Sequence, residues 1–285
     1  MAAAAPDVFR VALPNGVRVD AQAPPLREVM LRVPDAADAA FVLDSAQTAL
    51  PCERATKLLG RCLGVMDADG DRIARALTIG DREALLLHLR RAALGDAIDC
   101  MLQCPSPDCG EAMDLSLRAS DLLLAPYDDT RQEHEVVVES AGGPRRIAFR
   151  VPNAGDLDLA AALARRDPGR AVVELLRRCI LDIEDGSSAD TLDAEARAAV
   201  AAAMAEHDPQ AELQLQLACP SCGTAFSSVF DTAAFLLAEL EQRARRLTGE
   251  VHLLALNYHW REDDIVAMPA ARRARYVELL GARLQ

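Results

Sequence analysis

Two pairs of closely spaced cysteines are the residues of this sequence best suited to bind a metal ion. Cys104 and Cys109 lie in "CPSPDC", and Cys219 and Cys222 lie in "CPSC". Each pair offers two thiolates, whereas a structural zinc site takes four ligands in a tetrahedron. We therefore predict that the two pairs meet and hold one structural Zn2+ ion per chain.

The spacing of the second pair, C-x2-C, is typical of zinc ribbons, and the C-x4-C spacing of the first lies within the allowed range. Two other interpretations remain open, namely free thiols and redox-active dithiols. A redox C-x-x-C motif usually lies at a helix N-terminus near a βαβ unit, whereas each pair here follows a strand-like run, "AIDCMLQ" or "AELQLQLA". A shared metal ion is therefore the favoured interpretation.

The other four cysteines are expected to take no part in metal binding. Cys62 and Cys179 occupy matching helical positions among leucines, where a thiol behaves as a small buried hydrophobe. Cys100 lies on the strand that leads to the first pair and is close enough in sequence to approach the site, but a core position is favoured. Cys52 is expected to have no specific role.

The elements that must position the two pairs are repeated along the chain. "LRVPDAAD" at 31–38 corresponds to "FRVPNAGD" at 149–156, and "KLLGRCLGV" at 57–65 corresponds to "ELLRRCILD" at 174–182. The two cysteine pairs follow in the same order. These matched blocks predict an internal duplication of a unit of about a hundred residues, in which each copy contributes half of the metal site.

Each copy is expected to open with a β-hairpin, continue with two helices and end in a strand, a cysteine knuckle and a second strand. The first hairpin is predicted to turn at Asn15-Gly16 and the second at Gly142-Gly143. Four helices are predicted, at 51–66 and 168–183, which both begin at a proline, and at 80–94 and 192–207, with Asp81 and Asp193 as N-cap candidates.

The predicted fold class is α+β, as a tandem duplicated unit of helices and β-hairpins whose two zinc-ribbon-like cysteine knuckles meet at one site, followed by C-terminal helices. Five segments are predicted: an N-terminal arm and first hairpin at 1–28, a first repeat unit with its knuckle at 29–125, a connector and hairpin at 126–146, a second repeat unit with its knuckle at 147–240, and a C-terminal helical segment at 241–285.

The C-terminal segment has no counterpart in the first half. A long amphipathic helix of about seven turns is predicted from Asp231, weakened near Gly249, and Pro269 is predicted to start a final helix. We predict a partner-binding surface here because aromatic and arginine side chains often anchor interfaces; its residues are Tyr258, Trp260, Arg272, Arg273 and Tyr276. The alternative is that these helices cover the knuckles and complete the core.

Composition limits the classes of function. The chain has 285 residues and a net charge of −13, which argues against binding to nucleic acid or to anionic membranes, because both require clustered Lys and Arg. No secretory signal or membrane span is apparent, so a cytoplasmic location is expected. No nucleophile elbow, phosphate-binding loop or dinucleotide loop is present, and a four-thiolate zinc site has no open position for chemistry. We therefore expect a protein that is not an enzyme.

Four stretches resemble the T4-type phage baseplate family, which includes baseplate hub assembly proteins and related components of contractile injection systems. They are 76–96, 104–117, 219–240 and 250–280. The last stretch is the most specific; it carries Glu250, His252, Tyr258, Trp260 and Pro269 in order. The C-x4-C spacing of the first knuckle departs from the pattern.

The resemblance implies a non-enzymatic role in building a phage-tail-like contractile particle. Its implied partners are baseplate, hub, spike or tape-measure proteins, and its implied location is the cytoplasm during assembly or the virion or injection particle itself. Two alternatives stay open. One is a zinc-ribbon module of a transcription or nucleic-acid-associated complex, and the other is a redox or hydrolytic enzyme that uses the cysteines.

Overall fold

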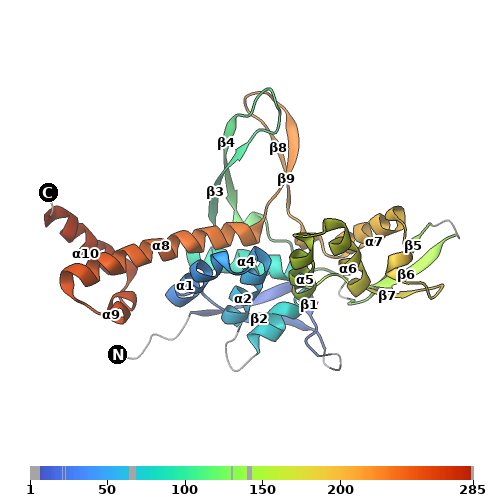
Figure 1. Ribbon diagram of the computed structural model, residues 1–285, viewed down its shortest axis with the longest axis horizontal. Coiled ribbons are helices and arrows are strands. Elements are labelled where there is room, and N and C mark those ends of the chain that lie inside the picture. The colour runs from blue at the N-terminus through green and yellow to red at the C-terminus, as the bar shows by residue number, and fades with distance from the viewer. Residues whose placement is uncertain are drawn as a thin grey trace. The chain divides into compact units, whose positions relative to one another are not determined.

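The computed structural model describes residues 7–20, 22, 24–63, 69–129, 131–139 and 143–283 (Figure 1). The chain divides into two compact units, of which the first comprises Met1–Val33 and Leu50–Ala233 and the second comprises Pro34–Ala49 and Ala234–Gln285. Helices and small antiparallel sheets occur together, which confirms the predicted mixture of helix and strand. The predicted segment boundaries remain predictions.

The first unit is built from hairpins and short helices. Its sheets are β1 (Val8–Val17) with β2 (Leu26–Arg32), β3 (Ala97–Gln103) with β4 (Ala112–Arg118), β5 (His134–Val138) with β6 (Arg145–Phe149) and β7 (Ile180–Ile183), and β8 (Gln214–Ala218) with β9 (Ala225–Val229). Its helices are α2 (Pro51–Leu63), α3 (Gly70–Ala76), α4 (Ile79–Leu94), α5 (Ala154–Ala164), α6 (Pro168–Cys179) and α7 (Ala194–His207), with the 3-10 helices η2 (Ala119–Asp121), η3 (Ala189–Thr191) and η4 (Pro209–Ala211). Residues 64–66 of the first predicted helix, and Gly142 of the second predicted turn, lie outside the described residues.

The first hairpin does not turn at Asn15-Gly16, so this prediction is wrong. β1 continues through both residues and pairs with β2 on both sides of an irregularity between Ala12 and Val17. Gly16 has a φ of 89°, which glycine adopts without steric cost, and the Asn15 N–H donates to Asp81 Oδ1 at 2.8 Å. A contact with a helix distant in sequence therefore overrides the local preference for a turn.

Asp81 is not the N-cap of α4, which corrects a second prediction. The N-cap is Thr78, whose Oγ1 accepts a hydrogen bond from the Asp81 N–H at 3.1 Å. The Asp81 carboxylate is turned instead toward Asn15. In α7 the predicted cap is confirmed, because Asp193 Oδ1 accepts from the Ala196 N–H at 2.8 Å.

The helix predicted over 168–183 is too long. α6 ends at Cys179, and Ile180–Ile183 forms β7, which pairs with β6. Helical spacing of apolar residues does not exclude a strand, and β-branched isoleucines suit an extended backbone. The free edge of the β5–β6 hairpin accepts this strand, so the tertiary context decides its conformation.

The two halves of the first unit repeat one contact at corresponding positions. Arg32 Nη2 donates to the carbonyl oxygen of Arg61 at 3.1 Å, and Arg150 Nη2 donates to the carbonyl oxygen of Arg178 at 3.0 Å. In both halves, this hydrogen bond ties the strand of the Arg-Val-Pro motif to the end of the following long helix. The matched sequence blocks thus carry matched contacts.

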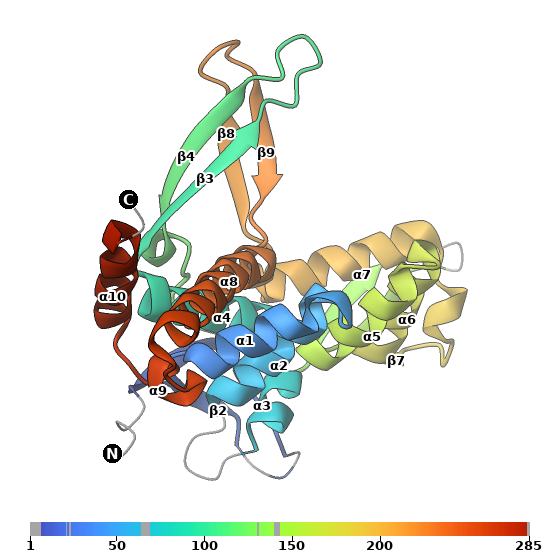
Figure 2. The same cartoon turned by 60° about the vertical axis from the view of Figure 1, so that its left-hand side comes forward.

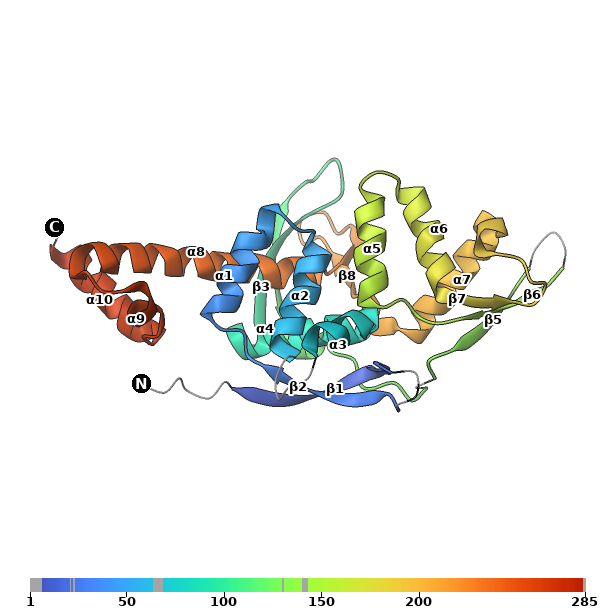
Figure 3. The same cartoon turned by 60° about the horizontal axis from the view of Figure 1, so that its bottom comes forward.

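The N-termini of α4 and α5 join the two halves. Thr78 and Asn153 form an isolated antiparallel bridge, and the Ala154 N–H donates to the Leu77 carbonyl oxygen at 2.9 Å. Helices α4 and α5 also contact each other, and α4 contacts β1; Figure 3 shows β1 and β2 along one side of this group. The second half has its own apolar core, which includes Val138, Ile147, Phe149, Leu176, Cys179, Ile183, Leu192, Ala196, Val200, Ala203 and Met204.

The second unit is helical in the part of the chain that the structure describes. Its helices are α1 (Ala36–Asp44), η1 (Ser45–Gln47), α8 (Thr232–Tyr258), whose first two residues belong to the first unit, α9 (Glu262–Val266) and α10 (Ala270–Arg283). α8 comprises 27 residues without a break at Gly249, so the predicted long helix is confirmed and the weakening predicted near Gly249 is not observed. α10 follows directly after Pro269. Among the described residues, no helix combines the length and apolar character needed to cross a membrane.

Candidate metal centre

The two cysteine pairs lie at the tips of two hairpins, β3–β4 and β8–β9, which we call the hairpin arm. Both hairpins extend side by side, away from the helices of the first unit (Figures 1 and 2). In the first hairpin the last paired residues before the tip are Gln103 and Ala112, and in the second they are Ala218 and Ala225. Two regular antiparallel ladders therefore carry the cysteines to one place.

Both turns are closed in the same way. The Cys104 N–H donates to the Glu111 carbonyl oxygen at 2.9 Å, and the Cys219 N–H donates to the Thr224 carbonyl oxygen at 2.9 Å. The glycine after the second cysteine of each pair has a positive φ, 58° at Gly110 and 74° at Gly223. A Cβ at either glycine would meet no atom within 4 Å, so the backbone conformation rather than space favours glycine there.

The four sulfur atoms match the geometry of a tetrahedral thiolate site. Cys104 Sγ lies 3.7 Å from Cys222 Sγ, and Cys109 Sγ lies 3.8 Å from Cys219 Sγ. All four sulfur atoms lie within 4.8 Å of one another. Zinc–sulfur bonds of about 2.3 Å in a tetrahedron separate the sulfur atoms by about 3.8 Å. The structure thus brings the four predicted ligands together at spacings that fit a metal ion bound by four cysteines.

The surroundings of the sulfur atoms differ from one side to the other. Cys104 and Cys219 are buried, and Met113, Leu102 and Phe226 pack against them. Cys222 is exposed, and its pKa is lowered to about 6 by hydrogen bonds from the side chain and the backbone of Thr224; Cys222 Sγ lies 3.2 Å from the Thr224 hydroxyl. A thiolate, the form that binds metal, is therefore favoured at one ligand near neutral pH.

The remaining cysteines lie outside this cluster. Cys62 and Cys179 are fully buried, as predicted for small apolar residues. Cys100 lies within β3, opposite Leu115 on β4, and is not one of the four clustered cysteines. Burial raises the pKa of Cys52 to about 11, so its thiol is protonated at neutral pH.

The three aromatic residues predicted to bind a partner pack on one another in the second unit. Tyr258 and Trp260 stack with ring centroids 4.7 Å apart, and Trp260 meets Tyr276 edge to face at 4.9 Å. They flank a small core of Leu254, Ile265 and Leu280. These rings connect α8 with α10. Packing within the chain therefore explains why aromatic residues are concentrated in this part of the sequence, and no partner protein is needed to explain it.

The two arginines of the same predicted surface differ in their contacts. Arg273 Nε donates to Glu250 Oε2 at 2.8 Å, and Arg273 Nη1 donates to the Met268 carbonyl oxygen. The Arg273 side chain is only 12% exposed, whereas Arg272 is exposed. Partner binding by the two arginines and the three aromatic residues remains a prediction.

A second cluster, Asp129, His134 and His207, does not fit a metal ion in the observed arrangement. Its candidate ligand atoms lie within 4.8 Å of one another, but the two imidazoles stack, with centroids 3.8 Å apart and planes inclined by 22°. The lone pair of a ring nitrogen lies in the ring plane, so two nearly parallel rings cannot both direct one toward an ion about 2.1 Å away. Asp129 is moreover paired with Arg131 at 2.7 Å.

A buried polar cluster lies between the two halves, and no sequence pattern indicated it. Asp208 Oδ2 accepts from the Gly80 N–H at 2.8 Å, and Asp208 Oδ1 accepts from the Tyr127 hydroxyl at 3.1 Å. Burial raises the pKa of Asp81 to about 7 and that of Asp208 to about 6. No spacing rule marks these residues, because they come from segments distant in sequence and Tyr127 lies in a stretch that reads as a polar connector.

Comparison with known proteins places this architecture in a family. Residues 53–237, more than half of the chain, match the family described as T4 bacteriophage base plate protein. The match includes both cysteine pairs but not the stretch 250–280, which was expected to be the most specific to the family. Searches of curated proteins and of solved structures returned no match. The chain therefore belongs to the T4 bacteriophage base plate protein family.

Proposed function

We propose that this protein is a non-enzymatic structural or assembly component of the baseplate or hub of a phage-tail-like contractile particle. The observation that carries the proposal is the family match over 53–237, which contains the complete four-cysteine cluster. In this proposal the hairpin arm is a rigid structural element rather than a reactive centre. The protein acts in the cytoplasm while the particle is assembled, and its partners are baseplate, hub, spike or tape-measure proteins.

The metal in this proposal is one Zn2+ ion per chain, held by Cys104, Cys109, Cys219 and Cys222. The sulfur spacings of 3.7 and 3.8 Å support four-thiolate coordination, and a four-thiolate, tetrahedral arrangement favours zinc over metals that prefer oxygen ligands. Zinc supplies no chemistry here, since four protein ligands leave no open position. The ion holds together two hairpins that pack only a few apolar side chains between them.

The two knuckles are, in this proposal, the ends of a duplicated unit, each resembling half of a zinc ribbon. In sequence order, each half of the chain has a hairpin, an Arg-Val-Pro motif, a helix with a capping box, a second helix and a knuckle-bearing hairpin. The first of the two capping-box helices, α1, belongs to the second compact unit. The paired contacts of Arg32 with Arg61 and of Arg150 with Arg178 support this interpretation. A duplication explains why each half carries two ligands and neither carries four.

The test is co-purification during particle production. A tagged chain should bring down hub, spike or tape-measure proteins from cells that are assembling particles, and deletion of the chain should stop particle assembly at the baseplate stage. A Cys219→Ser, Cys222→Ser variant should lose both the zinc and the co-purification, whereas a Cys100→Ser variant should keep them. Recovery of the wild-type chain without any particle protein would contradict the proposal.

A further inference from the structure

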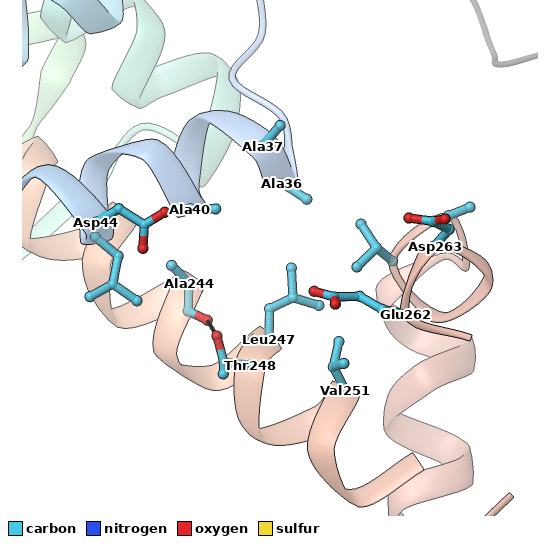
Figure 4. A pocket seen from close by; sticks show the side chains of 13 residues that line it. Ala36, Ala37, Ala40, Asp44, Ala244, Leu247, Thr248, Val251, Glu262 and Asp263 are labelled. Carbon is cyan, nitrogen blue, oxygen red and sulfur yellow. Dashed lines mark hydrogen bonds between the residues drawn. The ribbon is translucent and has the colours of Figure 1, made fainter. Parts of the chain in front are cut away.

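The second unit contains a groove that its own residues leave open. Helices α1 and α8 form its two long sides, and α9 lies at one end (Figure 4). Its volume is about 420 Å³, within the range of known ligand-binding pockets. Its lining includes Ala37 and Ala40 on α1, Leu247 and Val251 on α8, and Glu262 and Asp263 on α9.

The floor of the groove is apolar. It consists of alanine, leucine and valine side chains and one hydroxyl, that of Thr248. The Thr248 hydroxyl donates to the Ala244 carbonyl oxygen of its own helix at 3.0 Å, so its proton is not available to a ligand. Since an apolar floor offers no compensation for a buried polar group, the occupant must present apolar side chains.

The rim is acidic. Asp44, Glu262 and Asp263 are exposed at the groove, and none of its lining residues is basic. Asp44 is the last residue of α1, where the helix dipole disfavours a carboxylate. Asp263 forms an ion pair with Arg261 at 3.7 Å, and both side chains are highly exposed. Exposed ion pairs of this kind contribute little to stability. A cation placed at this rim would therefore be favoured.

We propose that this groove binds an amphipathic helix of a partner protein, which inserts aliphatic side chains between α1 and α8 and places Lys or Arg side chains beside Asp44 and Glu262. The small alanine side chains on α1 leave room in the groove for the side chains of a bound helix. Helices commonly bind to apolar grooves through residues spaced three and four apart. The inference rests on the proposed function in one respect: the partner is taken to be another protein of the particle.

The test uses the purified full-length chain and a synthetic probe. The probe is a fluorescently labelled helical peptide with leucines on one face, flanked by lysines. Two matched peptides serve as controls, one of the same composition with the leucines spread around the helix and one with every lysine replaced by glutamate. Fluorescence anisotropy should give saturable binding of the first peptide, with an affinity at least about tenfold higher than that of either control.

Variants then locate the site. Ala40→Trp fills the groove from an exposed position and should weaken binding at least about tenfold, while far-UV circular dichroism stays unchanged. Asp44→Lys with Glu262→Lys should weaken the lysine peptide and strengthen the glutamate peptide. Asp264→Lys, a single acid-to-lysine change on α9 outside the groove lining, should leave the affinities of both peptides unchanged.

Three results would overturn the inference: no saturable binding, equal binding of the scrambled peptide, or binding that Ala40→Trp leaves intact. Self-association of the chain that Ala40→Trp abolishes, detected by sedimentation velocity, would assign the groove to a second copy and overturn it as well. Since the peptide assay needs no particle, its failure alongside intact co-purification would refute this inference alone. Peptide binding without co-purification would instead refute the proposed particle function.

Discussion

Cys104 Sγ and Cys222 Sγ lie 3.7 Å apart although 118 residues separate them in the sequence. The second cross-hairpin pair, Cys109 and Cys219, has nearly the same separation. Each hairpin therefore approaches the other through both of its thiols, which is the arrangement that one tetrahedral ion requires.

Loss of a single ligand should abolish metal binding. Because structural zinc contributes on the order of 10 kcal/mol of apparent binding free energy, we expect Cys219→Ser to reduce bound zinc from one equivalent per chain to nearly none and to lower the melting temperature. Elemental analysis and calorimetry measure both quantities. Cys100→Ser, on the same arm but outside the cluster, is the matched control. One full equivalent of zinc in the Cys219→Ser variant would rule out the four-cysteine site.

Burial of Asp81 should make stability fall as pH rises. Its pKa is about 7 in the folded chain against an ordinary value of 3.8, chiefly through burial and then through the charge of Asp208. Below pH 3.8 both states are protonated, and between pH 3.8 and 7 only the unfolded state ionises, so up to about 4 kcal/mol of stability is lost across this window.

The variant Asp81→Asn should remove most of this pH dependence. The asparagine carbonyl can still accept from the Asn15 N–H, so the variant should be more stable than the wild type, with a larger gain at pH 8 than at pH 5. Urea denaturation at both pH values measures the difference. Asp128→Asn, at an exposed position, should change neither curve. A gain for Asp81→Asn that is equal at both pH values would contradict the assignment.

Burial of His134 should make the stability of the folded chain fall as the pH is lowered, which is the opposite of the effect of Asp81. Its pKa is lowered from 6.5, first by burial and then by the neighbouring His207, and neither ring nitrogen forms a hydrogen bond among the described residues. As pH falls below 6.5 the unfolded state takes up a proton that the folded state resists, so stability is lost on the acid side. His134→Phe should keep the ring packing with Phe149 and make the chain about 1–3 kcal/mol more stable at pH 5.5. The exposed control His252→Gln should have no such effect in thermal melts.

The ion pairs of Asp156 should contribute far more to the free energy of unfolding than an ion pair at the surface does. Asp156 is buried and accepts from Arg150 Nη1 at 2.6 Å and from Arg178 Nε at 2.8 Å. Arg150→Met removes one of the two arginine partners of this carboxylate, and we expect it to lower the free energy of unfolding by about 3 kcal/mol. Arg177→Met, which removes only the exposed pair with Glu174, should cost less than about 0.5 kcal/mol. Equal losses in chemical denaturation would show that the burial of Asp156 has no energetic role.

The sequence by itself determined which four cysteines cluster and much of the local structure. Cysteine spacing and the glycine after each pair specify the knuckles, and apolar spacing specifies α8 and the Asp193-capped α7. These features depend on interactions between residues close in the chain, which a pattern records directly.

Only the tertiary structure decided the features that depend on distant neighbours. Asn15 and Gly16 belong to a strand because the Asp81 carboxylate accepts a hydrogen bond from the Asn15 backbone N–H. Ile180–Ile183 forms β7 because β6 has a free edge with which it can pair. The raised pKa values of Asp81 and Asp208 arise from burial by segments far away in the chain. Burial and long-range hydrogen bonds are properties of the folded packing, so no local spacing of residue types encodes them.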